Sequence, residues 1–212
     1  MIEFTFFLII FLLSFSIIYV TNLWLYIEAV DINNFEKINL CCTWGEKIED
    51  GLLTYKILAS DKHKIIIQNA IDDWNQNLNG LIRLEPSVNS SADIEIKLNE
   101  NKSGKIAGQS TINYGPTGFI DNVKIILNEG TFGKSLSFNI IEIISKHELG
   151  HAFGIGHSNF ENSLMRLTHY NNESLEITEC EINAVIDANM WKLKNNSNFP
   201  YGTVEKFSIC KQ

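Results

Sequence analysis

Three histidines in one short stretch have the spacing of a metal site. Residues 147–157 read H-E-x-x-H-x-x-G-x-x-H, with histidines at His147, His151 and His157. Residues four apart on a helix lie on the same face, so His147 and His151 can direct ring nitrogens at one ion. Gly154 can adopt a positive φ, end the helix and return His157 as the third ligand. Three protein ligands with one open position are typical of a catalytic zinc.

Glu148 follows the first histidine and is the candidate general base. Its carboxylate can reach a water at the open position, and zinc lowers the pKa of such a water to about 7. Glu148 would accept the proton of this water and later pass it to a leaving group. The pattern therefore predicts one zinc ion and a hydrolytic reaction. The main alternative is a structural zinc, which needs a fourth ligand that the motif itself does not contain.

The residues after the third histidine extend the motif. Ser158 directly follows His157, and Met165 lies a short distance downstream. A motif of this kind with a downstream methionine resembles the metzincin clan of zinc peptidases, and Ser158 and the spacing to Met165 resemble its matrixin family. In that clan the methionine lies in a tight turn beneath the histidines. The resemblance therefore implies a Met turn at Met165.

The matrixin resemblance covers residues 44–194, and its specific part is residues 142–165. It implies a zinc-dependent endopeptidase that hydrolyses an extended polypeptide. In matrixins the substrate pairs as an added strand with the edge strand of the sheet. Residues 105–111 are the best candidate for this edge, with Ile106 and Ala107 as main-chain partners. A bulge at Ala107 that only bends the strand is the alternative.

Two departures from the matrixin pattern concern specificity and further ions. The Met turn continues with Arg166 and Leu167, where matrixins commonly have Tyr-Pro, so the shape of the specificity pocket is left open. Asp121 is the only acid in the loop before Val123, where animal matrixins cluster ligands for a structural zinc and calcium. A second zinc is therefore not expected, and calcium is left undecided.

Hydrophobic periodicity predicts the elements that must position these residues. Apolar side chains at helical spacing predict a helix over residues 61–78, and residues 138–153 form the helix that carries the metal motif. Thr178 and Glu181 form a capping box that opens a last helix. Strands are expected at residues 53–58, 81–85, 92–98, 105–114 and 123–127. This order resembles the matrixin catalytic domain and implies an α+β fold: a twisted, mixed five-stranded sheet with two long helices plus a C-terminal helix.

The N-terminal segment is long and apolar. Residues 4–27 contain no charged side chain, and as a helix they would span about 36 Å, enough to cross a bilayer core. A cleavable signal peptide is the alternative, but it would need a basic start and small residues at a cleavage site. The start carries the acidic Glu3 and no Lys or Arg, the apolar run is long, and no A-x-A motif is present, which favours an uncleaved anchor. We therefore expect a transmembrane anchor or signal segment at residues 1–28, a connector at 29–50 and the peptidase domain at 51–212, ending in an irregular tail.

The cysteines favour an extracytoplasmic domain. The chain has four, near the two ends of the part that follows the anchor: Cys41, Cys42, Cys180 and Cys210. Disulfides between them would tie the N-terminal segment or the last helix to the tail, which suits an oxidising compartment. The expected location is membrane-anchored with the catalytic domain outside the cytoplasm, or secreted if the N-terminal segment is cleaved.

Charge limits the partners, and two other functions compete with peptidase activity. The formal net charge is −8 without a basic stripe, which argues against nucleic-acid binding. The expected partners are a polypeptide substrate and a membrane contacted by the N-terminal segment. One competing function is a non-catalytic, membrane-anchored binding module that retains a structural zinc. The other is a metal-dependent hydrolase that acts on a non-peptide bond.

Overall fold

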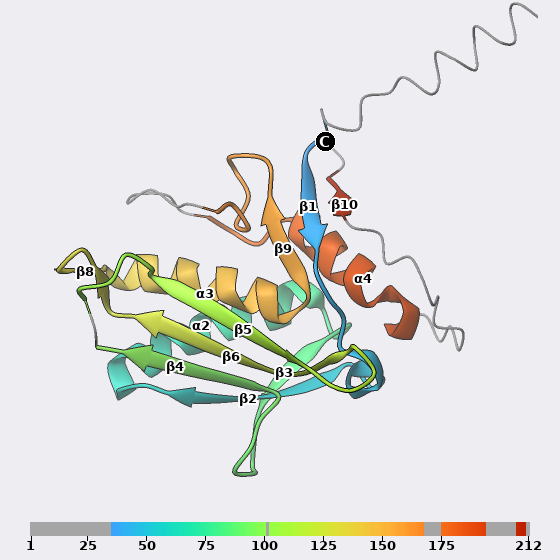
Figure 1. Ribbon diagram of the computed structural model, residues 1–212, viewed down its shortest axis with the longest axis horizontal. Coiled ribbons are helices and arrows are strands. Elements are labelled where there is room, and N and C mark those ends of the chain that lie inside the picture. The colour runs from blue at the N-terminus through green and yellow to red at the C-terminus, as the bar shows by residue number, and fades with distance from the viewer. Residues whose placement is uncertain (1–34, 101, 168–174, 194–206, 211–212) are drawn as a thin grey trace, which may run out of the picture. The chain divides into compact units, whose positions relative to one another are not determined.

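The computed structural model of the chain describes residues 35–100, 102–167, 175–193 and 207–210. It confirms the predicted α+β fold, with helices packed against a mixed sheet (Figure 1). The predicted anchor or signal segment, residues 1–28, lies outside the described residues. Within the described ranges, no helix is long and apolar enough to cross a bilayer.

The main sheet is mixed and has five strands, as the resemblance implied, and their order is β3-β2-β4-β6-β5. Neighbouring strands are parallel except for β5, which is antiparallel to β6 and forms one edge. The side chains of β4 alternate between buried and more exposed, so one face packs on the core, as the sequence pattern predicted. The bounds are Leu52–Leu58 for β2, Arg83–Pro86 for β3, Ile94–Asn99 for β4, Gly108–Tyr114 for β5 and Ile120–Asn128 for β6.

Two long helices, α2 (Asp61–Leu78) and α3 (Phe138–Ala152), lie side by side against the sheet (Figure 1). Polar contacts fix α3 on α2. The indole N–H of Trp74 donates to the carbonyl oxygen of Lys146 at 2.9 Å, and the Lys146 ammonium lies 2.5 Å from the Asp73 carboxylate. Because Lys146 immediately precedes the metal motif, α2 holds the helix that carries the histidines.

A second, smaller sheet was not predicted. It consists of β1 (Lys37–Leu40), β9 (Ile155–Ser158) and β10 (Phe207–Ile209), with β1 in the middle. The expectation of an irregular C-terminal tail was therefore wrong at Phe207–Ile209. Strands of three or four residues are too short to show a periodic pattern. The segment predicted as a connector, residues 29–50, includes β1 and a 3-10 helix, η2 (Gly45–Ile48).

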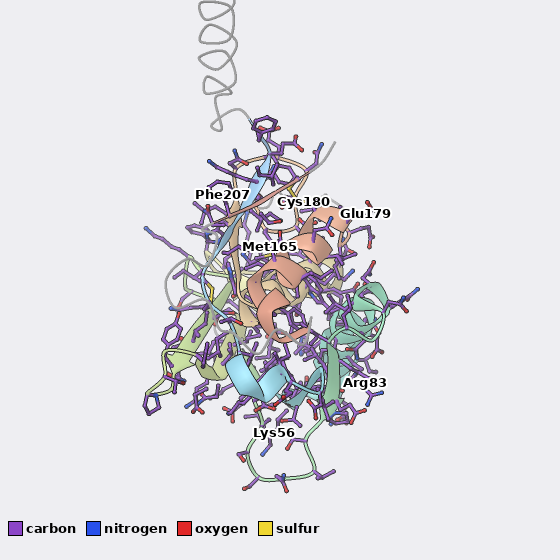
Figure 2. All side chains as sticks on the ribbon, turned by 90° about the vertical axis from the view of Figure 1, so that its right-hand side faces the viewer. Lys56, Arg83, Met165, Glu179, Cys180 and Phe207 are labelled. Carbon is purple, nitrogen blue, oxygen red and sulfur yellow. A yellow bond between two sulfur atoms is a disulfide. The ribbon has the colours of Figure 1, made fainter. Side chains whose placement is uncertain are left out.

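The last helix, α4 (Glu179–Leu193), is joined to the C-terminal end of the chain. A disulfide connects Cys180 in its first turn to Cys210, directly after β10. Figure 2 shows Cys180 and Phe207 at the same end of the domain, opposite Lys56 and Arg83. This bond is one of the two ties that the cysteine positions predicted. Cys41 and Cys42 are bonded to each other and tie no distant segment.

Candidate metal centre

Helix α3 carries the first two histidines. The hydroxyl of Ser137 accepts a hydrogen bond from the Ile140 N–H and caps the helix, and buried isoleucines hold its inner face on the core. His147 and His151 are one turn apart, and their ring centroids lie 4.7 Å from each other. The helix therefore places both rings on one face, as the spacing predicted.

Gly154 turns the chain after α3. Its φ is +96°, and a Cβ atom at this position would lie 2.2 Å from the carbonyl oxygen of Cys42. Only glycine satisfies both the left-handed backbone and this close approach. The chain then enters β9, where pairing with β1 holds His157. The His157 ring centroid lies 5.4 Å from that of His147 and 4.8 Å from that of His151.

The three imidazoles form a donor set that suits zinc. One nitrogen from each ring can be chosen so that all three lie within 4.8 Å of one another. His147 donates through Nδ1 to the carbonyl oxygen of Leu164 at 2.8 Å, and His151 donates through Nδ1 to that of Ile155 at 2.9 Å. These bonds leave Nε2 of both rings as the nitrogen that can bind a metal, an arrangement common among zinc-binding histidines.

Burial also keeps the histidines in the form that binds metals. Burial lowers the pKa of His151, and a hydrogen bond to the Ile155 carbonyl only partly offsets this effect. Burial and the neighbouring His151 lower the pKa of His157. Both rings are therefore neutral at neutral pH, which is the protonation state that a metal ligand needs.

Met165 lies directly beneath the face of α3 that carries His147 and His151. Its side chain is fully buried, and a Cβ atom at Gly150 would lie 2.5 Å from the Met165 sulfur. The backbone forms a tight turn here, closed by a hydrogen bond from the Arg166 N–H to the Ser163 carbonyl oxygen at 3.2 Å. The main-chain carbonyl oxygen of Met165 accepts a hydrogen bond from the Ser158 N–H at 2.9 Å, so the turn is tied to the residue after His157.

A buried carboxylate holds this turn in place. Glu181 accepts hydrogen bonds from the Ser163 hydroxyl at 2.7 Å and from the Leu164 N–H at 3.0 Å. Its other oxygen accepts from the N–H of Thr178, as the capping-box pattern predicted, and also from the Thr178 hydroxyl. The sequence therefore identified Glu181 as a helix cap, but it gave no local signal for the contact with the turn.

Glu148 lies beside the histidines with little access to solvent. Its side chain is buried, and burial raises the pKa of the carboxyl to about 7, although a hydrogen bond from Ser110 acts in the opposite direction. The Ser110 hydroxyl lies 2.7 Å from Oε2 of Glu148. A carboxyl with a pKa near neutrality can both accept and release a proton at neutral pH. Sequence reasoning did not identify Ser110.

A cavity of about 760 Å³ opens in front of the histidines and Glu148. Edge strand β5 and the segment before it form one wall, and the N-terminal half of α3 forms another. Besides the histidines and Glu148, the lining includes the polar residues Lys105, Gln109, Ser110 and Thr131. Its apolar part includes Ile106, Ala107, Phe132, Leu136, Ile140 and Ile144. The volume and the apolar part of the lining suit a ligand that carries apolar groups.

Ile106 and Ala107 lie on this wall, just before β5 begins at Gly108. The carbonyl oxygen of Ala107 accepts from the Asn128 N–H, and that of Ile106 accepts from the Asn128 side-chain amide, both at 2.8 Å. Backbone groups along a strand alternate in direction. Since the backbone of Ala107 faces β6 and pairs with Asn128, the N–H and C=O groups of Gly108 point to the open edge of the sheet.

Comparison with known proteins agrees with this geometry. The family model described as Matrixin matches residues 44–188, which is more than half of the chain and includes the main sheet, the three histidines and the Met165 turn. No curated protein matches the chain. Matrixins are zinc-dependent endopeptidases, so the family implies a metalloendopeptidase with a polypeptide substrate. With its fold, its histidine triad and this match, the chain belongs to the matrixin family.

Proposed function

We propose that the protein is a zinc-dependent endopeptidase in which His147, His151 and His157 hold one zinc ion and Glu148 is the general base. The observation that supports this most strongly is the convergence of three imidazoles beside a buried carboxylate. When bound, zinc would polarise the scissile carbonyl and lower the pKa of water, so that water can lose a proton and attack at neutral pH. Gly154 and Met165 support the site, the first by ending α3 and the second as an apolar floor.

The carboxylate of Glu148 moves the proton in this scheme. It takes a proton from the attacking water and later gives it to the leaving amine. Its pKa of about 7 in the metal-free protein fits a group that must both gain and lose a proton. The buried position of Glu148 limits competition from bulk water and strengthens its interaction with the reacting groups.

The substrate would bind as an extended strand beside β5. Ile106 and Ala107 are the predicted main-chain partners, but their carbonyl oxygens already accept from Asn128, so the outward backbone groups of Gly108, next to Glu148, are the ones that would pair with the substrate. Side chains of the substrate would enter the cavity lined by Ile140 and Ile144. An unfolded polypeptide fits this arrangement because its backbone is free to pair with the strand.

The N-terminal segment would anchor this domain outside the cytoplasm. The uncharged run at residues 4–27 is the basis for a membrane anchor at residues 1–28, followed by a connector at 29–50 and the peptidase domain at 51–212. The disulfide between Cys180 and Cys210 fits an oxidising compartment. If the segment is cleaved as a signal peptide, the peptidase is secreted.

The test is cleavage of a denatured protein by the parent and by Glu148→Gln, each with and without a chelator. We expect the parent to cleave only without chelator, and Glu148→Gln to bind zinc normally but to cleave orders of magnitude more slowly. Glu161→Gln is the matched control, because Glu161 is exposed and does not line the cavity. Activity that persists in Glu148→Gln would remove Glu148 from the role of general base.

The same experiment, extended to ester and amide substrates, separates the competing functions. In a binding module with a structural zinc, the chelator would unfold the domain, and neither parent nor variant would cleave. In a hydrolase of non-peptide bonds, ester or amide substrates would be cleaved while denatured proteins stayed intact. The open cavity in front of the triad favours the peptidase over the binding module.

A further inference from the structure

One hydroxyl group on the edge strand holds the Glu148 carboxylate. The Ser110 hydroxyl lies 2.7 Å from Oε2 of Glu148 and 3.1 Å from the main-chain oxygen of the same residue. A serine hydroxyl has a single hydrogen to donate. Since a carboxylate oxygen at the shorter distance is the stronger acceptor, the hydrogen goes mainly to Oε2. The orientation of the carboxylate is therefore linked to β5.

The same face of β5 also limits the other carboxylate oxygen. Gly108 is two residues from Ser110, so both residues face Glu148 from one side of the strand. A Cβ atom at Gly108 would lie 2.6 Å from Oε1 of Glu148 and 2.6 Å from a methyl carbon of Ile144. The strand thus supplies a donor for Oε2 and, through the missing side chain of Gly108, leaves space for Oε1.

We propose that Ser110 is a positioning residue for the general base, an inference that rests on the proposed function. Its hydroxyl donates to Oε2 of Glu148 and fixes the plane of the carboxylate, so that Oε1 is the oxygen that takes the proton from water. Without this bond the carboxylate can rotate about its last torsion, which is a broad one. Fewer encounters with water would then have the geometry that proton transfer needs.

A purely structural role for Ser110 makes a different prediction. The contact between the Ser110 hydroxyl and the main-chain oxygen of Glu148 could serve only to tie β5 to α3. In that case loss of the hydroxyl would lower the melting temperature and leave turnover unchanged. A positioning role affects turnover and leaves folding and zinc binding intact.

The experiment compares Ser110→Ala, Ser110→Thr and the parent in the full chain. It measures kcat and KM on a peptide substrate that the parent cleaves, together with zinc content and melting temperature. Ser110→Ala is expected to lower kcat about tenfold with KM within about twofold of the parent. Ser110→Thr keeps a hydroxyl and is expected to recover most of kcat.

A matched control removes a serine hydroxyl from α3 itself. Ser145 is buried and donates only to the Ile141 carbonyl oxygen, at 2.7 Å, among the contacts described. Ser145→Ala is therefore expected to keep the kcat of the parent. An unchanged kcat in Ser110→Ala, or an effect on KM alone, overturns the positioning role while the proposed function stands. If the zinc-loaded parent cleaves no polypeptide, the proposed function fails and this inference fails with it.

Discussion

The carboxylate of Glu181 accepts a hydrogen bond at 3.0 Å from the main-chain N–H of Leu164. The carbonyl oxygen of the same leucine accepts from Nδ1 of His147. Glu181 is fully buried, and it also accepts from the hydroxyl of Ser163. A carboxylate in the first turn of α4 therefore sets the position of the turn that orients a candidate zinc ligand.

Glu181→Gln is expected to weaken both the fold and the zinc site. The amide can accept through one oxygen only, so donors from Ser163 and Leu164 or from Thr178 lose their partner. Leaving buried donors unpaired costs about 1–3 kcal/mol of unfolding free energy, and disturbing the partner of a ligating histidine lowers metal affinity about tenfold or more. Urea unfolding and competition with a zinc chelator measure the two effects.

Glu179→Gln is the control for this prediction. Glu179 lies in the same first turn of α4 but is exposed, so its replacement should change the unfolding free energy by less than about 0.5 kcal/mol. Equal results for the two variants would show that the buried contacts of Glu181 do not support the turn.

Gly154→Ala is expected to destabilise the protein more than Gly118→Ala. Both glycines have a positive φ, +96° and +81°, so alanine is strained at either position. At Gly118 a Cβ atom meets nothing within 4 Å, whereas at Gly154 it would lie 2.2 Å from the carbonyl oxygen of Cys42. The loss in unfolding free energy should be about 1–2 kcal/mol for Gly118→Ala and clearly larger for Gly154→Ala.

The spectrum of bound cobalt adds a second measurement to this pair. Because Gly154 separates His151 from His157, its substitution should alter the spectrum or abolish binding, while Gly118→Ala should leave it unchanged. If Gly154→Ala binds cobalt like the parent and unfolds like Gly118→Ala, the backbone at the end of α3 can relax, and the close approach to Cys42 does not determine the site.

The sequence predicted the long elements and the convergence of the histidines because both are local properties. The helix expected over residues 61–78 is observed as α2, since its apolar spacing extends over many turns. The histidines meet because helical periodicity and one glycine fix their relative positions over a short segment. Local spacing therefore carried enough information for the core of the site.

The contacts that support the site come from distant segments, and the sequence did not reveal them. β1 pairs with β10 near the other end of the chain, and neither strand is long enough for a pattern. Ser110 reaches Glu148 only because β5 packs on α3. The edge strand was expected to start at residue 105, but β5 starts at Gly108, and before it Ala107 and Ile106 contact Asn128 through one main-chain and one side-chain hydrogen bond.

Replacing Cys180 and Cys210 together by serine is expected to lower the unfolding free energy. Their disulfide has a sequence separation of 30 and joins α4 to β10. A loop of this length corresponds to about 3–4 kcal/mol in the chain-entropy model. Urea unfolding of the oxidised parent and of the double variant gives the difference.

Replacing Cys41 and Cys42 by serine is the control, since a bond between adjacent residues closes almost no loop. The expected loss is about 1 kcal/mol, from packing around the buried Cys42. Equal losses in the two double variants would mean that the Cys180–Cys210 bond does not stabilise the fold through loop closure.

Zinc is expected to stabilise the parent against unfolding, and His151→Ala should remove this effect. A ligand that binds only the folded state adds about 2.7 kcal/mol at a free concentration of 100 times its dissociation constant. His63→Ala is the control: His63 is also buried, and its ring bonds Ser60 and lies 3.7 Å from Glu129, away from the triad. His63→Ala should have a lower unfolding free energy than the parent with and without zinc, but zinc should raise that free energy as much as it does in the parent. An increment in His151→Ala as large as in the parent would place the stabilising ion elsewhere, and the triad would lose its assignment as the zinc site.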